Sequence, residues 1–243
     1  MKKKEIKKEI LTIAFPSKGI TNPAFACALR LLNLDPFRIY ETIYISGCDT
    51  AVSRNKLANA AKGDYILFLD DDVLPPPNTI GKLYAHKKDF VSGLYFARQR
   101  PHYPQIHTIS KEDERRCDSV IDYKRDALIE VDATGGGCML IKKKVFEKLE
   151  EPYFHYIPAE GDAPKMGEDF YFCKKVKKAG FKIYCDTSVV CKHIGETFIG
   201  PEHWDFHRAK LTEIEKMMGP KGFEKYKQQV RKLDDRRRNI VNR

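Results

Sequence analysis

Apolar and polar positions along the first 70 residues follow a pattern that predicts strands separated by helices. Apolar runs at 10–16, 40–46 and 65–69 have the length and composition of buried strands. Between them, residues 22–32 and 49–63 carry the spacing and end residues of helices. This strand, helix, strand, helix, strand order predicts a doubly wound α/β fold with a mostly parallel central sheet flanked by helices.

The expected ends of these helices rest on particular residues. Asn22 is placed to cap the first helix, with Pro23 as its first helical residue, because proline there loses no hydrogen bond. The second helix is expected to begin at Asp49 and to end at Gly63 as its C-terminal cap.

The rest of the chain continues the pattern around a polar interval at 98–127, which is expected to be irregular. Residues 152–167 form a Pro- and Gly-rich loop, interpreted as a mobile lid or acceptor loop. The other elements expected are a helix near 78–86, a strand at 89–97, a strand, a triple glycine, a strand and a helix within 127–149, a helix from 168 to a cap at Gly180, two short strands ending near His193, and a helical remainder.

Positive charge is confined to the two ends of the chain. The formal net charge is +10, of which residues 1–8 carry +4 and residues 221–243 carry +6, so the body between them is neutral. A nucleic-acid enzyme would show positive charge across its working face, and no nucleic-acid partner is expected. We expect a basic N-terminal tail at 1–8, a catalytic domain at 9–210 and a helical basic extension at 211–243. The tails are either solvated ends or contacts for an anionic membrane surface.

Composition indicates a cytoplasmic protein, with peripheral membrane contact through the basic tails left open. Hydrophobic residues make up 42% of the chain, but no apolar run approaches the roughly 18 residues that span a bilayer. The N-terminus MKKKEIKKEI lacks the apolar stretch of a signal peptide. Seven cysteines without a CxxC pair fit reduced thiols better than a disulfide framework or a zinc site.

Candidate chemistry is concentrated at residues 65–76, YILFLDDDVLPP, where a buried strand runs into three carboxylates. Side chains alternate faces along an extended segment, so Asp70 and Asp72 are expected to point the same way and Asp71 the opposite way. Three adjacent anions need positive compensation, and a divalent cation with oxygen ligands would supply it. An acidic turn before a helix is the alternative, and it is about as common for an isolated DxD.

Four stretches of the chain resemble, in the same order, the motifs of GT-A fold glycosyltransferases, particularly family 2. They are AVSRNKLANAAKGDY, GDYILFLDDDVLPP, DATGGGCMLIKKKVFEKL and GEDFYFCKKVKKAGFKIYCDTSVVCKHIG. The resemblance covers roughly residues 9–200 and implies a Rossmann-like sheet. Two departures concern the nucleotide: the turn after the first strand reads PSKG, and only Asp49 follows the second strand as a carboxylate for the base.

The resemblance implies transfer of a sugar from a UDP- or GDP-linked donor to an acceptor hydroxyl on a glycan, lipid-linked or protein acceptor. Metal ligands would be Asp70, Asp72 and His193, with Asp71 as the fallback, and mixed oxygen and nitrogen ligation favours Mn²⁺ over Mg²⁺. The residues implied in nucleotide-sugar binding are Pro16, Ser17, Asp49, Arg54, Asn55, Asp70, Asp71, Gly135, Gly136 and Gly137.

The two acidic residues of the motif GED supply the catalytic residues that the resemblance implies. Asp169 would be the general base of an inverting reaction, and Glu168 would orient the acceptor. The start of the helix is expected to keep Asp169 ionised and to lower its basicity. An acidic pair that only complements the helix dipole is the simpler interpretation of the same residues.

The residues alone leave several alternative interpretations open. Glycines 135–137 would let the donor approach the backbone, or would only form a tight turn. Arg54 would pair with phosphates, or would be an ordinary exposed helix arginine. A retaining transferase, a non-enzymatic basic-tailed module with a degenerate metal site, and a homo-oligomer are also compatible. A dehalogenase-like phosphatase is disfavoured because Leu74 replaces the Thr or Val of that motif, and a sugar nucleotidyltransferase because PSKGITNP lacks its Gly-rich, Arg-containing loop.

Overall fold

A computed structural model of the chain describes residues 9–110, 115–160, 165–195 and 198–241, with side chains described as far as residue 228. The chain divides into two compact units after Pro201. The predicted basic tail at 1–8 lies outside the described residues. The predicted division into tail, catalytic domain and extension stays a prediction.

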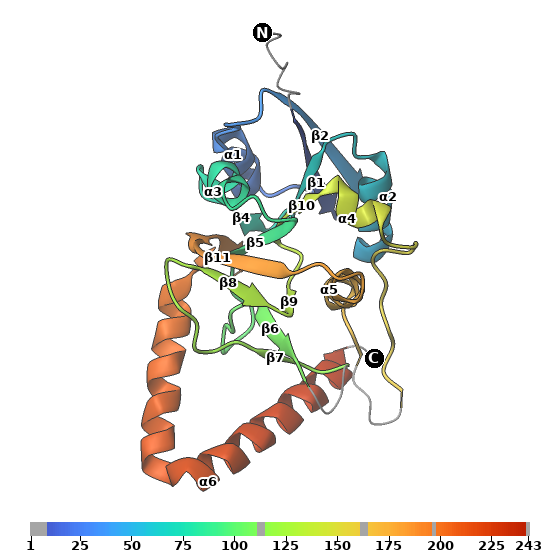
Figure 1. Cartoon of the computed structure of the whole chain (residues 1–243). Coiled ribbons are helices and arrows are strands. Elements are labelled where there is room, and N and C mark those ends of the chain that lie inside the picture. Colours follow the sequence, from blue (N-terminus) through green and yellow to red (C-terminus); the bar gives the residue numbers. More distant parts are fainter. Residues whose placement is uncertain (1–8, 111–114, 161–164, 196–197, 242–243) are drawn as a thin grey trace. The chain divides into compact units, whose positions relative to one another are not determined.

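A seven-stranded mixed sheet is the centre of the first unit (Figure 1). Its strands are, in spatial order, β2 (Ile39–Ser46), β1 (Ile10–Ser17), β3 (Tyr65–Leu69), β10 (Cys138–Lys142), β5 (Phe90–Leu94), β11 (Ile183–Val190) and β8 (Leu128–Val131). Strands β2, β1, β3, β5 and β11 run in one direction, and β10 and β8 run against them. The predicted α/β fold with a mostly parallel sheet is confirmed.

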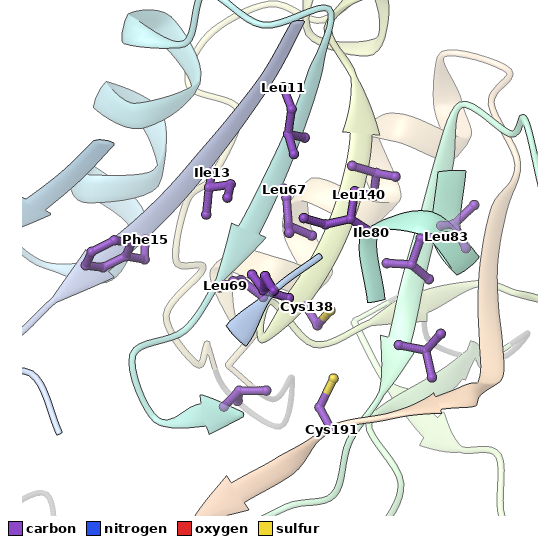
Figure 2. Close-up of a cluster of buried hydrophobic side chains, with 14 of the residues drawn as sticks. Leu11, Ile13, Phe15, Leu67, Leu69, Ile80, Leu83, Cys138, Leu140 and Cys191 are labelled. Carbon is purple, nitrogen blue, oxygen red and sulfur yellow. The ribbon is translucent and has the colours of Figure 1, made fainter. Parts of the chain in front are cut away.

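Helices cover both faces of this sheet, as the alternation of buried side chains requires. The helices are α1 (Pro23–Leu31), α2 (Thr50–Ala60), α3 (Thr79–Ala85), α4 (Lys143–Glu147) and α5 (Glu168–Lys178). In Figure 1, α1 and α3 lie on one side of the sheet and α2 and α4 on the other. On the first side, alternate residues of β1, β3 and β10 form a buried apolar cluster with Ile80 and Leu83 of α3 (Figure 2).

Aromatic packing fixes the opposite face. Phe68 of β3 contacts Phe146 of α4 and Phe154, with ring centroids 6.0 and 5.7 Å apart. Phe172 of α5 stacks on Phe154 at 4.3 Å and also packs against Phe90 of β5. These contacts place the start of α5 beside the middle of the sheet.

The helix starts follow the sequence, but one predicted helix end is wrong. Asn22 accepts the Ala24 N–H at 2.8 Å, and Asp49 accepts the Ala51 N–H at 2.9 Å, as capping residues do. However, α2 ends at Ala60, and Gly63 is not its cap. Gly63 instead lies against β1, where an added Cβ would come within 2.5 Å of the Thr12 backbone nitrogen. Close packing, not a turn conformation, therefore requires this glycine.

Two small sheets were not anticipated by the pattern. One has the order β13 (Phe198–Ile199), β12 (Lys192–Ile194), β4 (Val73–Leu74), and the other β7 (Cys117–Ser119), β6 (Ile106–Ile109), β9 (Ala133–Thr134). The expectation that 98–127 is irregular is therefore wrong in part. These strands are short and partly polar, so their formation depends on their pairing partners more than on their own sequence pattern. The predicted pair of short strands before His193 also differs, since β11 alone has eight residues.

The second unit begins at Glu202 and contains the helix α6 (Pro201–Val241) except for its first residue. The backbone leaves helical geometry at Gly219, with φ 68° and ψ 167°, directly before Pro220. The predicted helical C-terminal segment is confirmed, and a kink at Gly219 divides it into two helical parts. Within the described residues, every helix is too short or too polar to cross a bilayer. All seven cysteines are free thiols.

Candidate functional site

The acidic triplet and the triple glycine meet at one edge of the central sheet. Asp70 follows the end of β3, and Gly137 immediately precedes β10. Because β10 runs against β3, its beginning lies at the edge where β3 ends. The Asp70 N–H donates to the Gly137 carbonyl at 3.1 Å. This is the edge at which open α/β sheets bind ligands.

The three aspartates form a turn, so the expectation of an extended, alternating triplet is wrong. Strand β3 ends at Leu69, and the Val73 N–H donates a hydrogen bond to the Asp70 carbonyl at 3.0 Å. Asp70 and Asp72 consequently face different partners, while Asp71 is partly exposed. Compensating positive charge comes from arginines that are distant in sequence, which the local sequence could not reveal.

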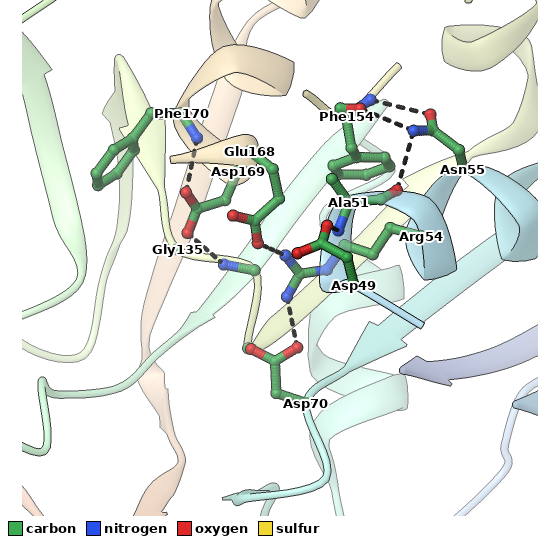
Figure 3. A network of polar contacts seen from close by, with 12 residues as sticks. Asp49, Ala51, Arg54, Asn55, Asp70, Gly135, Phe154, Glu168, Asp169 and Phe170 are labelled. Carbon is green, nitrogen blue, oxygen red and sulfur yellow. Dashed lines mark hydrogen bonds and ion pairs between the residues drawn. The ribbon is translucent and has the colours of Figure 1, made fainter. Parts of the chain in front are cut away.

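Arg54 of α2 is buried, with 1% of its surface exposed, at the centre of this edge (Figure 3). Its Nη2 lies 2.5 Å from Asp70 Oδ1, and its Nη1 donates to Glu168 Oε1. Burial alone would lower the pKa of Arg54, but the charges of Asp70 and Glu168 outweigh it and raise the pKa. The simple interpretation of Arg54 as an exposed helix arginine is therefore wrong. It joins the acidic turn to the acidic helix start.

Asp169 lies beside this ion-pair network at the first turn of α5. Its Oδ1 accepts the Phe170 N–H at 2.9 Å, and its Oδ2 accepts the Gly136 N–H at 3.3 Å. Burial raises the pKa of Asp169, and the charge of Glu168 adds to it, so the pKa reaches about 7 against the opposing charge of Arg54. The expectation that the helix start lowers the basicity of Asp169 is wrong, because burial and Glu168 outweigh the helix dipole.

Asp72 and His193 form a second polar pair at the same edge. Strand β12 pairs with β4, and the Ile194 N–H donates to the Asp72 carbonyl at 2.8 Å. This pairing holds His193 Nε2 3.4 Å from Asp72 Oδ1, while Arg98 Nη1 lies 3.2 Å from Asp72 Oδ2. Burial raises the pKa of Asp72, but the hydrogen bond from His193 and the charges of His193 and Arg98 hold it below its usual value.

The donor atoms of this pair fit a divalent cation. His193 Nδ1 lies 2.8 Å from the Phe96 carbonyl, so Nδ1 carries a proton that it donates there. Nε2, which faces the Asp72 carboxylate, is therefore the ring nitrogen that could bind a cation. A backbone carbonyl that orients a histidine in this way is typical of metal ligands.

Asp70 does not join this pair, because Arg54 engages its carboxylate. Among the residues that the structure describes, three or more His, Cys, Asp or Glu side chains nowhere gather in a group suited to a metal ion. Asp72 and His193 would thus hold a cation as two protein ligands, the remainder coming from substrate and solvent. That division is common for Mg²⁺-type sites.

The three glycines make room for side chains of this chain. A Cβ at Gly136 would collide with the Arg54 guanidinium, and one at Gly137 would lie 2.8 Å from Tyr95 Cζ and Val73 Cγ2. The Gly137 N–H donates to Tyr95 Oη at 3.2 Å. The glycine turn therefore allows Arg54 and Tyr95 to reach the edge. Contact between these glycines and a donor stays a prediction.

Asn55, next to Arg54, holds the chain between α4 and α5. Its Oδ1 accepts the N–H groups of Tyr153 and Phe154 at 2.8 and 3.0 Å, and its Nδ2 donates to the Phe154 carbonyl at 2.7 Å. The start of the predicted lid, 152–167, is thus fixed to α2, while residues 161–164 lie outside the described residues. The lid itself stays a prediction.

The remaining predicted donor residues lie at the ends of β1 and the start of α2. Pro16 and Ser17 are buried at the end of β1, and Ser17 Oγ accepts the Gly19 N–H at 3.2 Å. Asp49 is exposed and caps α2. The edge rule that selects Asp70 applies equally to Tyr95 and Arg98, which follow β5 and were missed from the sequence.

The central sheet and its flanking helices form an α/β fold of the GT-A type. Residues 48–150 match the family model described as Glycosyl transferase family 2, which confirms the resemblance that the motifs indicate. The match includes Arg54, the acidic turn and the glycine turn.

Two solved structures share the fold. The protein A197 from STIV has a TM-score of 0.56 and 22% identity, over 79% of this chain and 91% of that one. GalNAc-T7, crystallised with UDP, GalNAc and Mn²⁺, has a TM-score of 0.50 and 11% identity, over 74% of this chain and 43% of that one. Among curated proteins, none matches the sequence significantly.

Proposed function

We propose that this protein is a metal-dependent glycosyltransferase that moves a sugar from a nucleoside-diphosphate donor to an acceptor hydroxyl. The observation that carries the proposal is the link made by Arg54 between Asp70, on the strand that ends at the ligand edge, and Glu168, beside Asp169. One buried guanidinium thus adjoins a candidate donor site on one side and a candidate base on the other. The family match and the GT-A fold of the solved relatives support the same class of reaction.

Donor binding is assigned to the turn and strand ends at this edge. Asp72 and His193 would hold a divalent cation, for which Mn²⁺ is favoured by the mixed oxygen and nitrogen donors and by its presence with UDP in the GalNAc-T7 crystal. When bound, the cation supplies charge that stabilises the departing diphosphate. Asp70 or Asp71 would contact the ribose, and Pro16, Ser17 and Asp49 are placed for the nucleotide.

Asp169 is proposed as the general base. Its ionised carboxylate takes the proton of the acceptor hydroxyl while that oxygen forms a bond to the anomeric carbon, and the bond from that carbon to the diphosphate oxygen breaks with its electron pair leaving on the diphosphate. A pKa of about 7 suits this step, because a base is most effective when its pKa lies near the working pH. Glu168, held by Arg54, keeps a second negative charge beside Asp169. Direct displacement by the acceptor inverts the anomeric configuration.

The experiment that tests the proposal uses a panel of UDP- and GDP-sugars with the full chain and Mn²⁺. We expect hydrolysis or transfer of at least one donor, abolished by EDTA and restored by Mn²⁺. NMR of the product then distinguishes inversion from retention at the anomeric carbon. Thermal stabilisation by polyanions, with no stabilisation by any nucleotide plus Mn²⁺, would instead support a non-enzymatic binding module.

A further inference from the structure

Arg98 pairs with Asp72, one of the two candidate cation ligands. Its Nη1 lies 3.2 Å from Asp72 Oδ2, while His193 Nε2 faces the other oxygen of the same carboxylate at 3.4 Å. The Asp72 carboxylate is thus shared between a candidate metal ligand and an arginine. A divalent cation bound to Asp72 and His193 would repel the Arg98 guanidinium at this distance.

The segment that carries Arg98 is built into the site. The carbonyl of Phe96, two residues earlier, accepts a hydrogen bond from His193 Nδ1. The backbone around Arg98 forms a closed turn, since the Ala97 N–H donates to the Tyr103 carbonyl at 2.9 Å. Half of the Arg98 side chain is exposed, so the guanidinium can move while its backbone stays in place.

Arg98 is not the sole basic side chain near Asp72. The charge of Lys18, just beyond β1, also acts on this carboxylate. A metal ion bound to Asp72 would add further positive charge beside these two side chains. That positive charge suits a ligand with more than one negative charge, such as a diphosphate.

We propose that Arg98 is a diphosphate-binding residue that exchanges partners, pairing with Asp72 in the free protein and with the donor diphosphate when a cation occupies Asp72. The proposal rests on the proposed function and adds to it a residue outside the motif set. An arginine suits this role because its planar fork bonds two phosphate oxygens at once and its charge does not depend on pH. The exchange would also couple cation binding to diphosphate binding.

The test measures two affinities on the full chain and on the variants Arg98→Gln, Arg98→Lys and Arg100→Gln. Calorimetry gives the affinity for UDP and GDP with Mn²⁺ present, and the EPR signal of free Mn²⁺ gives the affinity for Mn²⁺ alone. Arg100 is the matched control, because it is an exposed arginine in the same turn.

Arg98→Gln is expected to weaken diphosphate binding about tenfold, the effect of losing a charged hydrogen bond, and to tighten binding of Mn²⁺ alone, because a competitor for Asp72 is gone. Arg98→Lys should retain part of the diphosphate affinity, and Arg100→Gln should change neither. A merely structural role would weaken both ligands together, and that result would overturn the proposal.

The two proposals fail in different ways. Equal diphosphate affinity in the wild type and Arg98→Gln refutes the role of Arg98 and leaves the proposed function standing. A wild-type chain that binds neither UDP nor GDP, with Mn²⁺ present, refutes the proposed function and this inference with it.

Discussion

Arg54 Nη2 lies 2.5 Å from Asp70 Oδ1, an ion pair between the buried face of α2 and the turn that follows β3. The same guanidinium donates to Glu168, 114 residues away in the sequence. The acidic turn and Glu168, the neighbour of the candidate base, therefore share one cation. Their geometry depends on a residue that need not touch the substrate.

Replacing Arg54 by Met should destabilise the fold by about 3–5 kcal/mol, because it leaves two carboxylates without their buried partner. Urea unfolding measures the loss. Arg30→Met, at an exposed position in the last turn of α1, should change stability by less than about 0.5 kcal/mol. Equal effects of the two variants would show that the Arg54 network contributes no more than a surface charge.

Activity should depend on pH through Asp169. Its pKa is raised to about 7, so the carboxylate is protonated and inactive below that value and ionised above it. We expect kcat/KM to fall about tenfold per pH unit below pH 7 and to level off above it. A profile that is flat between pH 5 and 8 would contradict this assignment.

Removing the base should separate catalysis from binding. Asp169→Asn is expected to abolish transfer while donor affinity stays nearly unchanged, as measured by calorimetry with Mn²⁺. Asp126→Asn is the control, since Asp126 is exposed and its φ of 50° suits asparagine. Loss of donor affinity in Asp169→Asn with normal turnover would remove Asp169 from the role of base.

Much of the fold could be predicted because its information is local. Alternation and end residues place β1 to β3 with α1 and α2, and the edge rule brings Asp70 to a ligand site. What could not be predicted depends on partners far apart in sequence. Burial of Arg54 needs both Asp70 and Glu168, and the pKa of Asp169 needs the packing around α5. The residues next to Arg54 in the sequence do not indicate that its side chain is buried and ion-paired.

Metal binding should require both members of the Asp72–His193 pair. Asp72→Asn and His193→Gln should each weaken Mn²⁺ binding at least about tenfold, measured by EPR of free Mn²⁺. His86 offers a matched control, because its ring lies 2.8 Å from Asp186 in a pair of the same kind. His86→Gln should leave Mn²⁺ affinity unchanged, and an unchanged titration in Asp72→Asn would refute the ligand assignment.

Gly136→Ala should destabilise the fold by about 1–3 kcal/mol, because the new methyl group overlaps the Arg54 guanidinium. Gly81→Ala within α3 provides a control of opposite sign. Its Cβ would meet only the Asp35 carbonyl at 3.4 Å, and alanine gains about 0.5–1 kcal/mol in a helix. Thermal unfolding of both variants checks the prediction, which a neutral Gly136→Ala would contradict.

Asn55→Ala should release the chain at Tyr153 and Phe154 from α2, at a cost of about 1–3 kcal/mol for the unsatisfied backbone groups. Hydrogen exchange should then accelerate at those two amides. Asn59→Ala, one turn along the same helix, removes a single exposed bond to Glu151 and should have little effect. Unchanged exchange at both amides in Asn55→Ala would show that other contacts hold this segment.

The position of β10 in the sheet bears on how the protein is synthesised. Strands β3 and β5 are successive strands of the central sheet in chain order, yet β10, which begins only at Cys138, lies between them. It joins β1, β2 and β3 to β5, β11 and β8. A nascent chain on the ribosome therefore exposes the edges of both β3 and β5 until residue 142 has emerged. During that interval the growing polypeptide is open to mispairing, and chaperones that shield strand edges would act most usefully there.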